Sequence, residues 1–362
     1  MCPKGNRKII MIDDYEIDNH KLIYHPERIC EWMQKKDCFP IYVEVGLTNR
    51  CNHRCIFCAL DWFKTKKTDI KKEIMLSALG NMVDSGVKSI MFAGEGEPLL
   101  HKDFSLFVKR SKEKGLDIAV TTNGVFFDEK IANACLPYLS WIRFSIDAGT
   151  SETYAKIHGA KKEEFSKVIS NIKRTIEIKN KMNYQVVVGL QCLLIPQNFS
   201  EIESLAKMAK EIGVNNLQLK PYSHHPKSKN DFSIKYTDLK NLKQKLEVFN
   251  DEKFAVIYRD KTIDRLEQKQ DYPKCYGLPF FALIDSNGNV LPCNLFYNNE
   301  DFFYGNIYKN SFNKIWKSNR RKEVLKKIKE KGICECRKGC RLDVINRYLY
   351  RLEKPHFHDK FI

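Results

Sequence analysis

The chain has 362 residues, of which 43% are hydrophobic, and its formal net charge is +17 at pH 7. Its 22 Phe, 16 Tyr and 4 Trp exclude intrinsic disorder, and no apolar run reaches the roughly 18–20 residues that span a bilayer. The first residues contain no apolar signal-peptide core, so we expect a cytoplasmic protein. The odd number of cysteines, 13, favours metal or redox chemistry over a disulfide framework.

From residue 41 onward, apolar strand-like runs alternate with amphipathic helical stretches. This alternation indicates parallel βαβ units, and six strands predict an α/β fold with a partial (β/α)6 TIM-like barrel. In such barrels the chemistry lies at the carboxyl ends of the strands. The predicted strands are 41–47, 88–93, 117–122, 141–147, 185–195 and 216–220, and the predicted helices are 71–85, 103–114, 128–136, 162–179 and 200–212.

The chain changes in character after the sixth predicted strand. A polar, proline-containing stretch leads into a charged helix at 238–248, and a hairpin at 282–291 turns at Asn287-Gly288. A basic amphipathic helix is predicted at 314–331. The predicted divisions are an N-terminal extension or lid (1–40), the barrel (41–225), a linker with a helix (226–270), a small cysteine-containing α+β domain (271–345) and a tail (346–362).

Three cysteines follow the first predicted strand, in the order Cys51-Asn-His-Arg-Cys55-Ile-Phe-Cys58. Three thiolates at CxxxCxxC spacing suit one corner of a cubic 4Fe–4S cluster and leave its fourth iron open to an added ligand. The alternative is a zinc site with His53 as the fourth ligand, but zinc sites prefer four ligands in CxxC pairs. The sequence therefore predicts an iron–sulfur cluster on this loop.

This loop, with Phe57 before its last cysteine, resembles that of the radical S-adenosylmethionine (SAM) superfamily. Gly94-Glu-Gly-Glu-Pro98, after the second predicted strand, is similar to the family's GGEP motif. The resemblance implies that Gly96 and Glu97 bind SAM, with the Glu97 carboxylate accepting the methionine ammonium, and that Phe57 packs beside the adenine. Glu95 stands where the family usually has Gly, and is either a second ammonium acceptor or a substrate contact.

Two further strand ends resemble the SAM pocket of the family. Thr121-Thr-Asn-Gly124 ends the third strand and Ser145-Ile-Asp147 ends the fourth. The resemblance implies that Asn123, Ser145 and Asp147 contact SAM, the last two through its ribose hydroxyls or methionine group. The competing interpretation is a turn at each strand end, or a helix N-cap at Asp147.

A second set of cysteines resembles the SPASM or shorter twitch extension of radical SAM enzymes, which holds auxiliary iron–sulfur clusters. It departs from the family's usual CxxC pair, because its last three cysteines have CxC and CxxxC spacing. Five cysteines fit one auxiliary 4Fe–4S cluster, closed by four thiolates, better than two clusters; structural zinc is the alternative. The candidate ligands are Cys275, Cys293 and two of Cys334, Cys336 and Cys340, with Cys336 and Cys340 favoured.

By resemblance, SAM bound at the first cluster is cleaved by one electron to methionine and a 5′-deoxyadenosyl radical, which abstracts hydrogen from substrate. An auxiliary cluster gives the substrate radical an electron acceptor, so a two-electron oxidation is expected of a radical SAM oxidoreductase. That oxidation needs a base. Candidate catalytic residues are Glu95 and, near the end of the sixth strand, Lys220, Tyr222, His224 and His225; the alternative is a polar loop without a catalytic part.

The expected substrate is a carbohydrate-like or nucleotide-linked small molecule, because the single auxiliary cluster and the spacing of Cys275 and Cys293 are somewhat like those of 2-deoxy-scyllo-inosamine dehydrogenase. Maturation of a peptide or protein is the second hypothesis. A zinc-stabilised, basic nucleic-acid-binding protein and a non-catalytic electron carrier are alternatives from other classes. Residues 314–341 hold 12 Lys/Arg and 3 Asp/Glu, which suits a flavodoxin- or ferredoxin-type electron donor better than nucleic acid.

Overall fold

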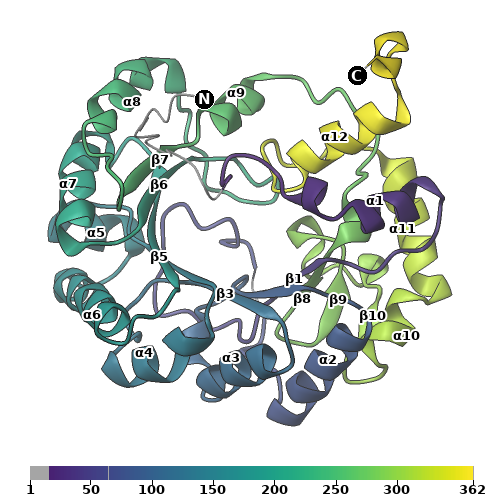
Figure 1. The fold of residues 1–362 in the computed structure, drawn as a ribbon, viewed down its shortest axis with the longest axis horizontal. Helices are drawn as coiled ribbons and strands as arrows, with labels where there is room; N and C mark the ends of the chain where they lie inside the picture. Colours follow the sequence, from purple (N-terminus) through teal and green to yellow (C-terminus); the bar gives the residue numbers. More distant parts are fainter. Residues whose placement is uncertain (1–15, 64, 362) are drawn as a thin grey trace, which may run out of the picture.

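Seven parallel strands run side by side through the centre of the computed structural model, which describes residues 16–63 and 65–361. Figure 1 shows that the sheet curves, with helices along its outer side. The strands are β1 (Tyr42–Val45), β2 (Ser89–Phe92), β3 (Asp117–Thr122), β4 (Trp141–Ser145), β5 (Val187–Leu194), β6 (Asn216–Pro221) and β7 (Ala255–Tyr258). The helices between them are α2 (Lys72–Asp84), α3 (Phe104–Glu113), α4 (Glu129–Cys135), α5 (Ser151–His158), α6 (Lys162–Lys181), α7 (Ile202–Ile212) and α8 (Lys240–Glu247).

The predicted partial barrel is confirmed, and all six predicted strands form. Strand β7 adds a seventh within the stretch interpreted as a linker, where it pairs with β6. Helix α5 is also additional: Thr150 caps its first turn and Gly159, with φ of 57°, ends it in the left-handed conformation. The sequence Ala-Gly-Thr before α5 is a local turn signal, which concealed the helix that follows.

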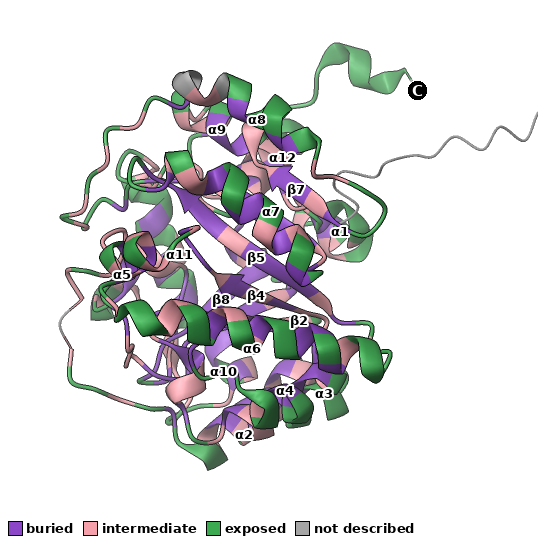
Figure 2. Ribbon diagram, turned by 90° about the vertical axis from the view of Figure 1, so that its left-hand side faces the viewer, coloured by how far each residue is buried: buried purple, intermediate pink, exposed green. Residues whose placement is uncertain are grey.

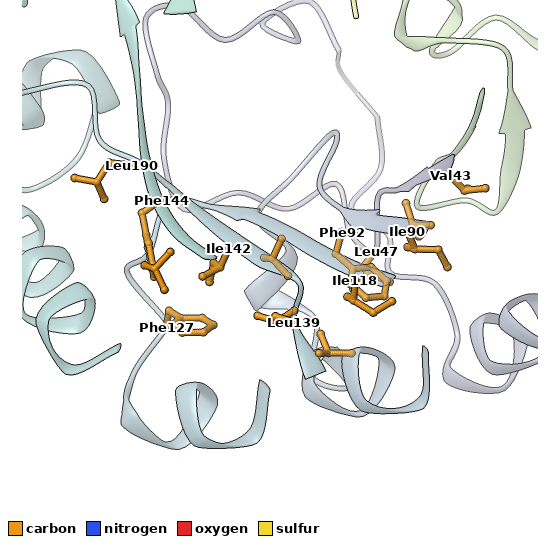
Figure 3. Close-up of a cluster of buried hydrophobic side chains, with 14 of the residues drawn as sticks. Val43, Leu47, Ile90, Phe92, Ile118, Phe127, Leu139, Ile142, Phe144 and Leu190 are labelled. Carbon is orange, nitrogen blue, oxygen red and sulfur yellow. The ribbon is translucent and has the colours of Figure 1, made fainter. Parts of the chain in front are cut away.

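The two faces of the curved sheet have opposite chemistry, because side chains alternate along each strand. Apolar side chains from the strands meet the helices on the outer face, as Figure 3 shows for Ile90, Ile142 and Phe144. Figure 2 shows the complementary pattern on the helices, which expose only their outward sides. The inner face instead collects polar groups, among them Glu44, Arg143, Ser145, Gln191, Gln218 and Lys220.

The C-terminal region continues the same sheet. Strand β8 (Phe281–Ile284) pairs in parallel with β1, β9 (Asn289–Leu291) pairs antiparallel with β8, and β10 (Gly305–Asn306) pairs antiparallel with β9. The predicted hairpin is present, and Gly288 at its turn has φ of 78°. The predicted helix 314–331 is two helices, α10 (Phe312–Trp316) and α11 (Asn319–Lys331), because Ser318 caps the second. Helices α9 (Asp260–Glu267) and α12 (Asp343–Glu353) flank this region.

The N-terminal segment packs against the C-terminal region. Helix α1 (Pro26–Met33) and its neighbours share an apolar cluster with Tyr272, Tyr276 and Leu349. The Trp316 indole donates to the Cys38 carbonyl at 2.8 Å. The described part of 1–40 is thus an extension packed on the C-terminal elements; residues 1–15, including Cys2, lie outside the described residues. Among the described residues, every helix is too short or too polar to cross a bilayer.

In the outer layer, we expect an aromatic-to-alanine substitution to cost the protein most stability where the ring is fully enclosed. Phe127 has no exposed area and meets Phe144 edge-to-face, with ring centroids 5.5 Å apart (Figure 3). Phe127→Ala should lower the free energy of unfolding by about 3–5 kcal/mol, measured by chemical denaturation, because it leaves a cavity. Its sequence neighbour Phe126 is 38% exposed, so Phe126→Ala should cost less than about 1 kcal/mol. Equal losses at the two positions would contradict this account.

Candidate functional site

The cysteine loop that follows β1 is held along the end of α5. The Arg54 amide donates to the His158 carbonyl at 2.8 Å, and the Ile56 amide donates to the Ile157 carbonyl at 2.9 Å. Gly159 makes this approach possible, because a Cβ there would lie 2.7 Å from the Arg54 carbonyl oxygen. The backbone of the loop is therefore hydrogen-bonded directly to the backbone at the end of α5.

The second motif supports the loop from the end of β2. The Glu97 amide donates to the Arg50 carbonyl at 2.8 Å. A Cβ at Gly96 would lie 2.4 Å from the Thr48 carbonyl oxygen and 2.5 Å from that of Arg50. The glycine before Glu97 is thus required because the two backbones touch.

Glu97 is buried directly beneath this contact. Its carboxylate accepts hydrogen bonds from the Thr122 hydroxyl at 2.6 Å and the Asn123 amide at 2.8 Å. Burial raises the pKa of Glu97 to about 7, although these hydrogen bonds act to lower it. A cationic ammonium beside it would favour the ionised form, so the predicted role of Glu97 is compatible with its surroundings.

The three strand-end residues differ in their partners. Asn123 donates to the Asn52 side chain at 2.8 Å and so ties β3 to the cysteine loop. Ser145 lies opposite Gln191 on the inner face and is partly exposed. Asp147 accepts from the Leu193 amide at 2.5 Å and lies 3.3 Å from His158 Nε2. Asp147 is not the helix cap of the competing interpretation, because Thr150 caps α5.

Cys51, Cys55 and Cys58 lie close together on the loop. The Cys58 amide donates to the Cys55 carbonyl at 3.0 Å, and each of Cys51 and Cys58 raises the pKa of the Cys55 thiol in addition to the larger effect of burial. Burial also raises the pKa of Cys51 to about 11. Such thiols lose their protons when a metal binds, so the three fit a cluster with one open iron.

Two histidines lie behind Cys55. The His158 Nδ1 atom is 3.3 Å from the Cys55 sulfur, and burial lowers the pKa of His158 to about 3, so the ring is neutral. His53, Cys55 and His158 could together hold a metal ion, with ligand atoms within 4.8 Å of one another. However, His53 Nε2 bonds Glu164 at 2.8 Å, and this group leaves out Cys51 and Cys58. No motif at the sequence level pointed to His158, which comes from a different element.

Phe57 packs on an apolar surface at the ends of β5 and β6. Its ring meets His158 edge-to-face with centroids 5.9 Å apart, and it borders a buried cluster formed by Ile157, Leu193, Ile195 and Tyr222. This places an aromatic ring and aliphatic groups beside the cysteine loop. The packing of Phe57 against adenine stays a prediction.

The four candidate catalytic residues near the end of β6 occupy different surroundings. Lys220 lies on the inner face and is partly exposed. The Tyr222 hydroxyl already donates to the Asn230 carbonyl, and burial raises its pKa. His224 is exposed on the following loop, whereas its neighbour His225 is buried and stacks on Trp62 at 5.8 Å. Burial lowers the pKa of His225 to about 4.

Glu95 lies away from the β6 residues, where β2 meets the β8–β9 turn. One of its oxygens accepts from the Ser286 amide at 2.5 Å, and the other is buried without a hydrogen bond. Burial, followed by the nearby carboxylate of Asp285, raises the pKa of Glu95 to about 7. The structure thus joins this extra carboxylate to the C-terminal hairpin, and β2, which precedes Glu95, lies four strands from β6 in the sheet.

Four of the five C-terminal cysteines come together. Burial raises the pKa of Cys275, and the thiols of Cys340, Cys293 and Cys336 raise it further. Cys334 is exposed, and among these four thiols it raises the pKa of Cys336 alone. Asn346 on α12 supports the set: its amide nitrogen lies 3.6 Å from the Cys275 sulfur, and its oxygen accepts from the Tyr276 and Gly277 amides at 2.8 Å. Sequence reasoning missed Asn346, which no cysteine spacing marks.

We expect Gly96→Ala to disrupt the cysteine loop, because the new methyl group would collide with two backbone carbonyls that cannot rotate away. The variant, reconstituted anaerobically, should lose about half of its iron, since one of two 4Fe–4S clusters is affected. Gly80→Ala is the matched control, because a Cβ on that helical glycine meets only the end of Lys114, at 3.7 Å. Full iron content in Gly96→Ala would refute the proposed contact.

Comparison with known families agrees with this geometry. Residues 45–209 match the Radical SAM superfamily, and residues 275–341 match SPASM, an iron–sulfur cluster-binding domain. A GTP 3′,8-cyclase of Nautilia profundicola is 33% identical over 181 residues, covering 48% of this chain and 54% of the relative. A probable GTP 3′,8-cyclase of Saccharolobus solfataricus is 27% identical over 245 residues, covering 67% of this chain and 72% of the relative. The chain thus spans about half the length of the first of these relatives.

Solved structures share the fold. Streptococcus suis SuiB bound to precursor peptide SuiA has a TM-score of 0.64 at 17% identity, covering 83% of this chain and 70% of that one. Native anSMEcpe with bound AdoMet has a TM-score of 0.57 at 21% identity, covering 80% of this chain and 84% of that one. The two matched domains imply SAM and 4Fe–4S clusters as cofactors, and both thiol sets fit them. The chain thus contains a Radical SAM domain followed by a SPASM iron–sulfur cluster-binding domain.

Proposed function

We propose that this radical SAM enzyme abstracts hydrogen from a carbohydrate-like or nucleotide-linked small molecule and oxidises it by two electrons. The observation that carries the proposal is the cysteine loop, whose three thiols are held by backbone bonds to the ends of β2 and α5. When bound, the cofactors supply a 5′-deoxyadenosyl radical from SAM and an auxiliary cluster that can take one electron from the substrate. The proposed ligands of the SAM-binding cluster are Cys51, Cys55 and Cys58.

The residues around the loop are proposed to orient SAM. Glu97 would accept hydrogen bonds from the methionine ammonium, and Phe57 would cover one face of the adenine. Ser145 and Asp147 lie at the carboxyl end of β4, where they can reach the ribose or the methionine group. Asn123 acts on SAM mainly by holding Asn52 of the cysteine loop.

Two-electron oxidation requires that the substrate lose one hydrogen atom from carbon, one proton from the oxygen or nitrogen bonded to that carbon, and one electron. We assign Cys275, Cys293, Cys336 and Cys340 to the auxiliary cluster, where four thiolates leave no iron open for substrate. Glu95 is the proposed proton acceptor, because one oxygen has no hydrogen bond and its pKa of about 7 suits a base at neutral pH. Tyr222 is a weaker candidate because its hydroxyl already donates to the Asn230 carbonyl, and His224 is weaker because its side chain is exposed.

The substrate class is supported by the curated relatives, whose names specify GTP, a nucleotide. The names of those relatives specify a cyclisation and therefore do not support an oxidation. The proposed oxidation rests instead on the second thiol set of this chain, which can hold an electron-accepting cluster. Peptide maturation is weaker, because the peptide-bound neighbours share only the fold. Zinc-mediated nucleic-acid binding loses its basis, since both thiol sets lie in iron–sulfur domains. The basic helix α11 is the proposed docking face for an acidic flavodoxin- or ferredoxin-type donor.

The reaction class is tested on anaerobically reconstituted protein. Wild type should hold about eight irons per chain and form 5′-deoxyadenosine when given SAM and reductant. Cys51→Ala should form none, because the cluster that binds SAM loses a ligand. Cys30→Ala is the control, since Cys30 is exposed on α1, outside both thiol sets. Absence of 5′-deoxyadenosine from wild type supplied with candidate nucleotides and sugars would refute the proposal.

The auxiliary ligands are tested by three single changes. Cys336→Ser and Cys340→Ser should each reduce the iron content from about eight to about four per chain, because a closed cluster loses one of four thiolates. Cys334→Ser should retain about eight, since this exposed thiol lies outside the four. Loss of iron in Cys334→Ser with retention in Cys336→Ser would reverse the assignment.

A further inference from the structure

Positive side chains gather on the inner face of the barrel, beyond the residues assigned to SAM and the clusters. Arg143 on β4 and Lys220 on β6 both occupy inner-face positions, and both remain partly exposed although their strands lie inside the sheet. Arg143 lies opposite Gly189 of β5, where the Asn216 side chain of β6 takes the place of a side chain: a Cβ at Gly189 would lie 2.5 Å from Asn216 Oδ1. Two partly buried cations therefore lie at the centre of the fold.

More cations surround these two. Burial lowers the pKa of Lys220 well below its usual range, and the guanidiniums of Arg337, Arg259, Arg341 and Arg143 lower it further. Burial, followed by Arg259, likewise lowers the pKa of Arg143 to about 10. Five cations thus act on one another across the inner face, which is an unfavourable arrangement unless anions balance it.

The available carboxylates do not balance all of them. Arg341 forms an ion pair with Glu44 at 2.5 Å, and Arg259 pairs with Asp18 at 3.3 Å. Within the described residues, Lys220 has neither an ion pair nor a hydrogen bond, and Arg143 has only the Trp141 ring, 4.6 Å from its guanidinium carbon. The Arg143 Nε atom is buried without a partner.

Nearby anionic groups already have other partners. Asp147 is close enough for Lys220 to lower its pKa, but its oxygens face the Leu193 amide and His158. The auxiliary thiols act on Arg337, through Cys340, whereas no cysteine is among the groups that shift the pKa of Lys220 or Arg143. Neither Lys220 nor Arg143 is therefore explained as a counter-ion of a cluster.

Burying unpaired cations costs stability, and a protein retains such an arrangement where a ligand supplies the missing charge. We propose that Lys220 and Arg143 bind a phosphate group of the substrate on the inner face of the barrel. The inference rests on the proposed function, which it sharpens to a phosphorylated small molecule. A phosphate dianion matches two unpaired cations, and the guanidinium fork can contact two of its oxygens. Lys220 is thus assigned to substrate binding rather than to proton transfer.

Calorimetry with inorganic pyrophosphate, on reconstituted holoenzyme without reductant, tests the site. Wild type should bind, and Lys220→Met and Arg143→Gln should each weaken binding by about tenfold or more, since each removes a charge-assisted hydrogen bond. Lys207→Met is the matched control, because Lys207 is 70% exposed on α7, and should bind as wild type does. No binding by wild type, or equal binding by all variants, would overturn the proposal.

Two further measurements separate this role from others. In the absence of any anion, Lys220→Met should melt at a higher temperature than wild type, because an uncompensated buried charge is removed; a lower melting temperature would make Lys220 a structural residue and overturn the proposal. Citrate binding more tightly than pyrophosphate would overturn the choice of phosphate. A greater loss of affinity for SAM than for pyrophosphate in the variants would assign the cations to the SAM carboxylate instead.

Because no reductant is present, these results are independent of the reaction. Pyrophosphate binding with no 5′-deoxyadenosine formed in the earlier experiment would leave the anion site standing and refute the proposed function. Formation of 5′-deoxyadenosine without pyrophosphate binding would refute the anion site and leave the proposed function standing.

Discussion

The contact between two backbones, that of the cysteine loop and that of the segment after β2, is the constraint on which the candidate site depends. It exists because Gly96 has no side chain, so the Thr48 and Arg50 carbonyls can approach and the Glu97 amide can bond Arg50. The same approach buries the Glu97 carboxylate under the loop. Position and chemistry are therefore coupled: the residue that secures the loop by its amide carries the carboxylate proposed to hold SAM.

A second constraint is the pairing of β8 with β1, which makes one sheet out of two matched domains. It places the C-terminal cysteines beside the open side of the barrel rather than at the end of a flexible tether. Two further contacts tie the segment of the last cysteines to the barrel, since Arg341 forms an ion pair with Glu44 on β1 and Arg337 donates to Ser223 after β6 at 2.9 Å. A fixed distance between the thiol sets is what electron transfer from a substrate held between them would require.

The inner face illustrates how function and stability oppose each other. The outer face is apolar and fully packed, and it supplies the hydrophobic stabilisation of the barrel. The inner face instead holds a carboxyl with a raised pKa, Asp147, and cations with lowered ones, Arg143 and Lys220. Burial of charged groups costs stability, and the proposed charged substrate and cofactors would offset that cost.

The sequence by itself determined the strands and most helices of the barrel and the two groups of cysteines, because these depend on local periodicity and spacing. It also located the ends of β2, β3 and β4 as places for polar side chains. It did not reveal α5, β7 or the pairing of β8 with β1. Only the tertiary structure separated Cys334 from the other four C-terminal thiols, placed His158 behind Cys55 and joined Glu95 to the β8–β9 turn. The physical reason is that these relations arise between segments more than one hundred residues apart in several cases, where burial and charge depend on which surfaces meet.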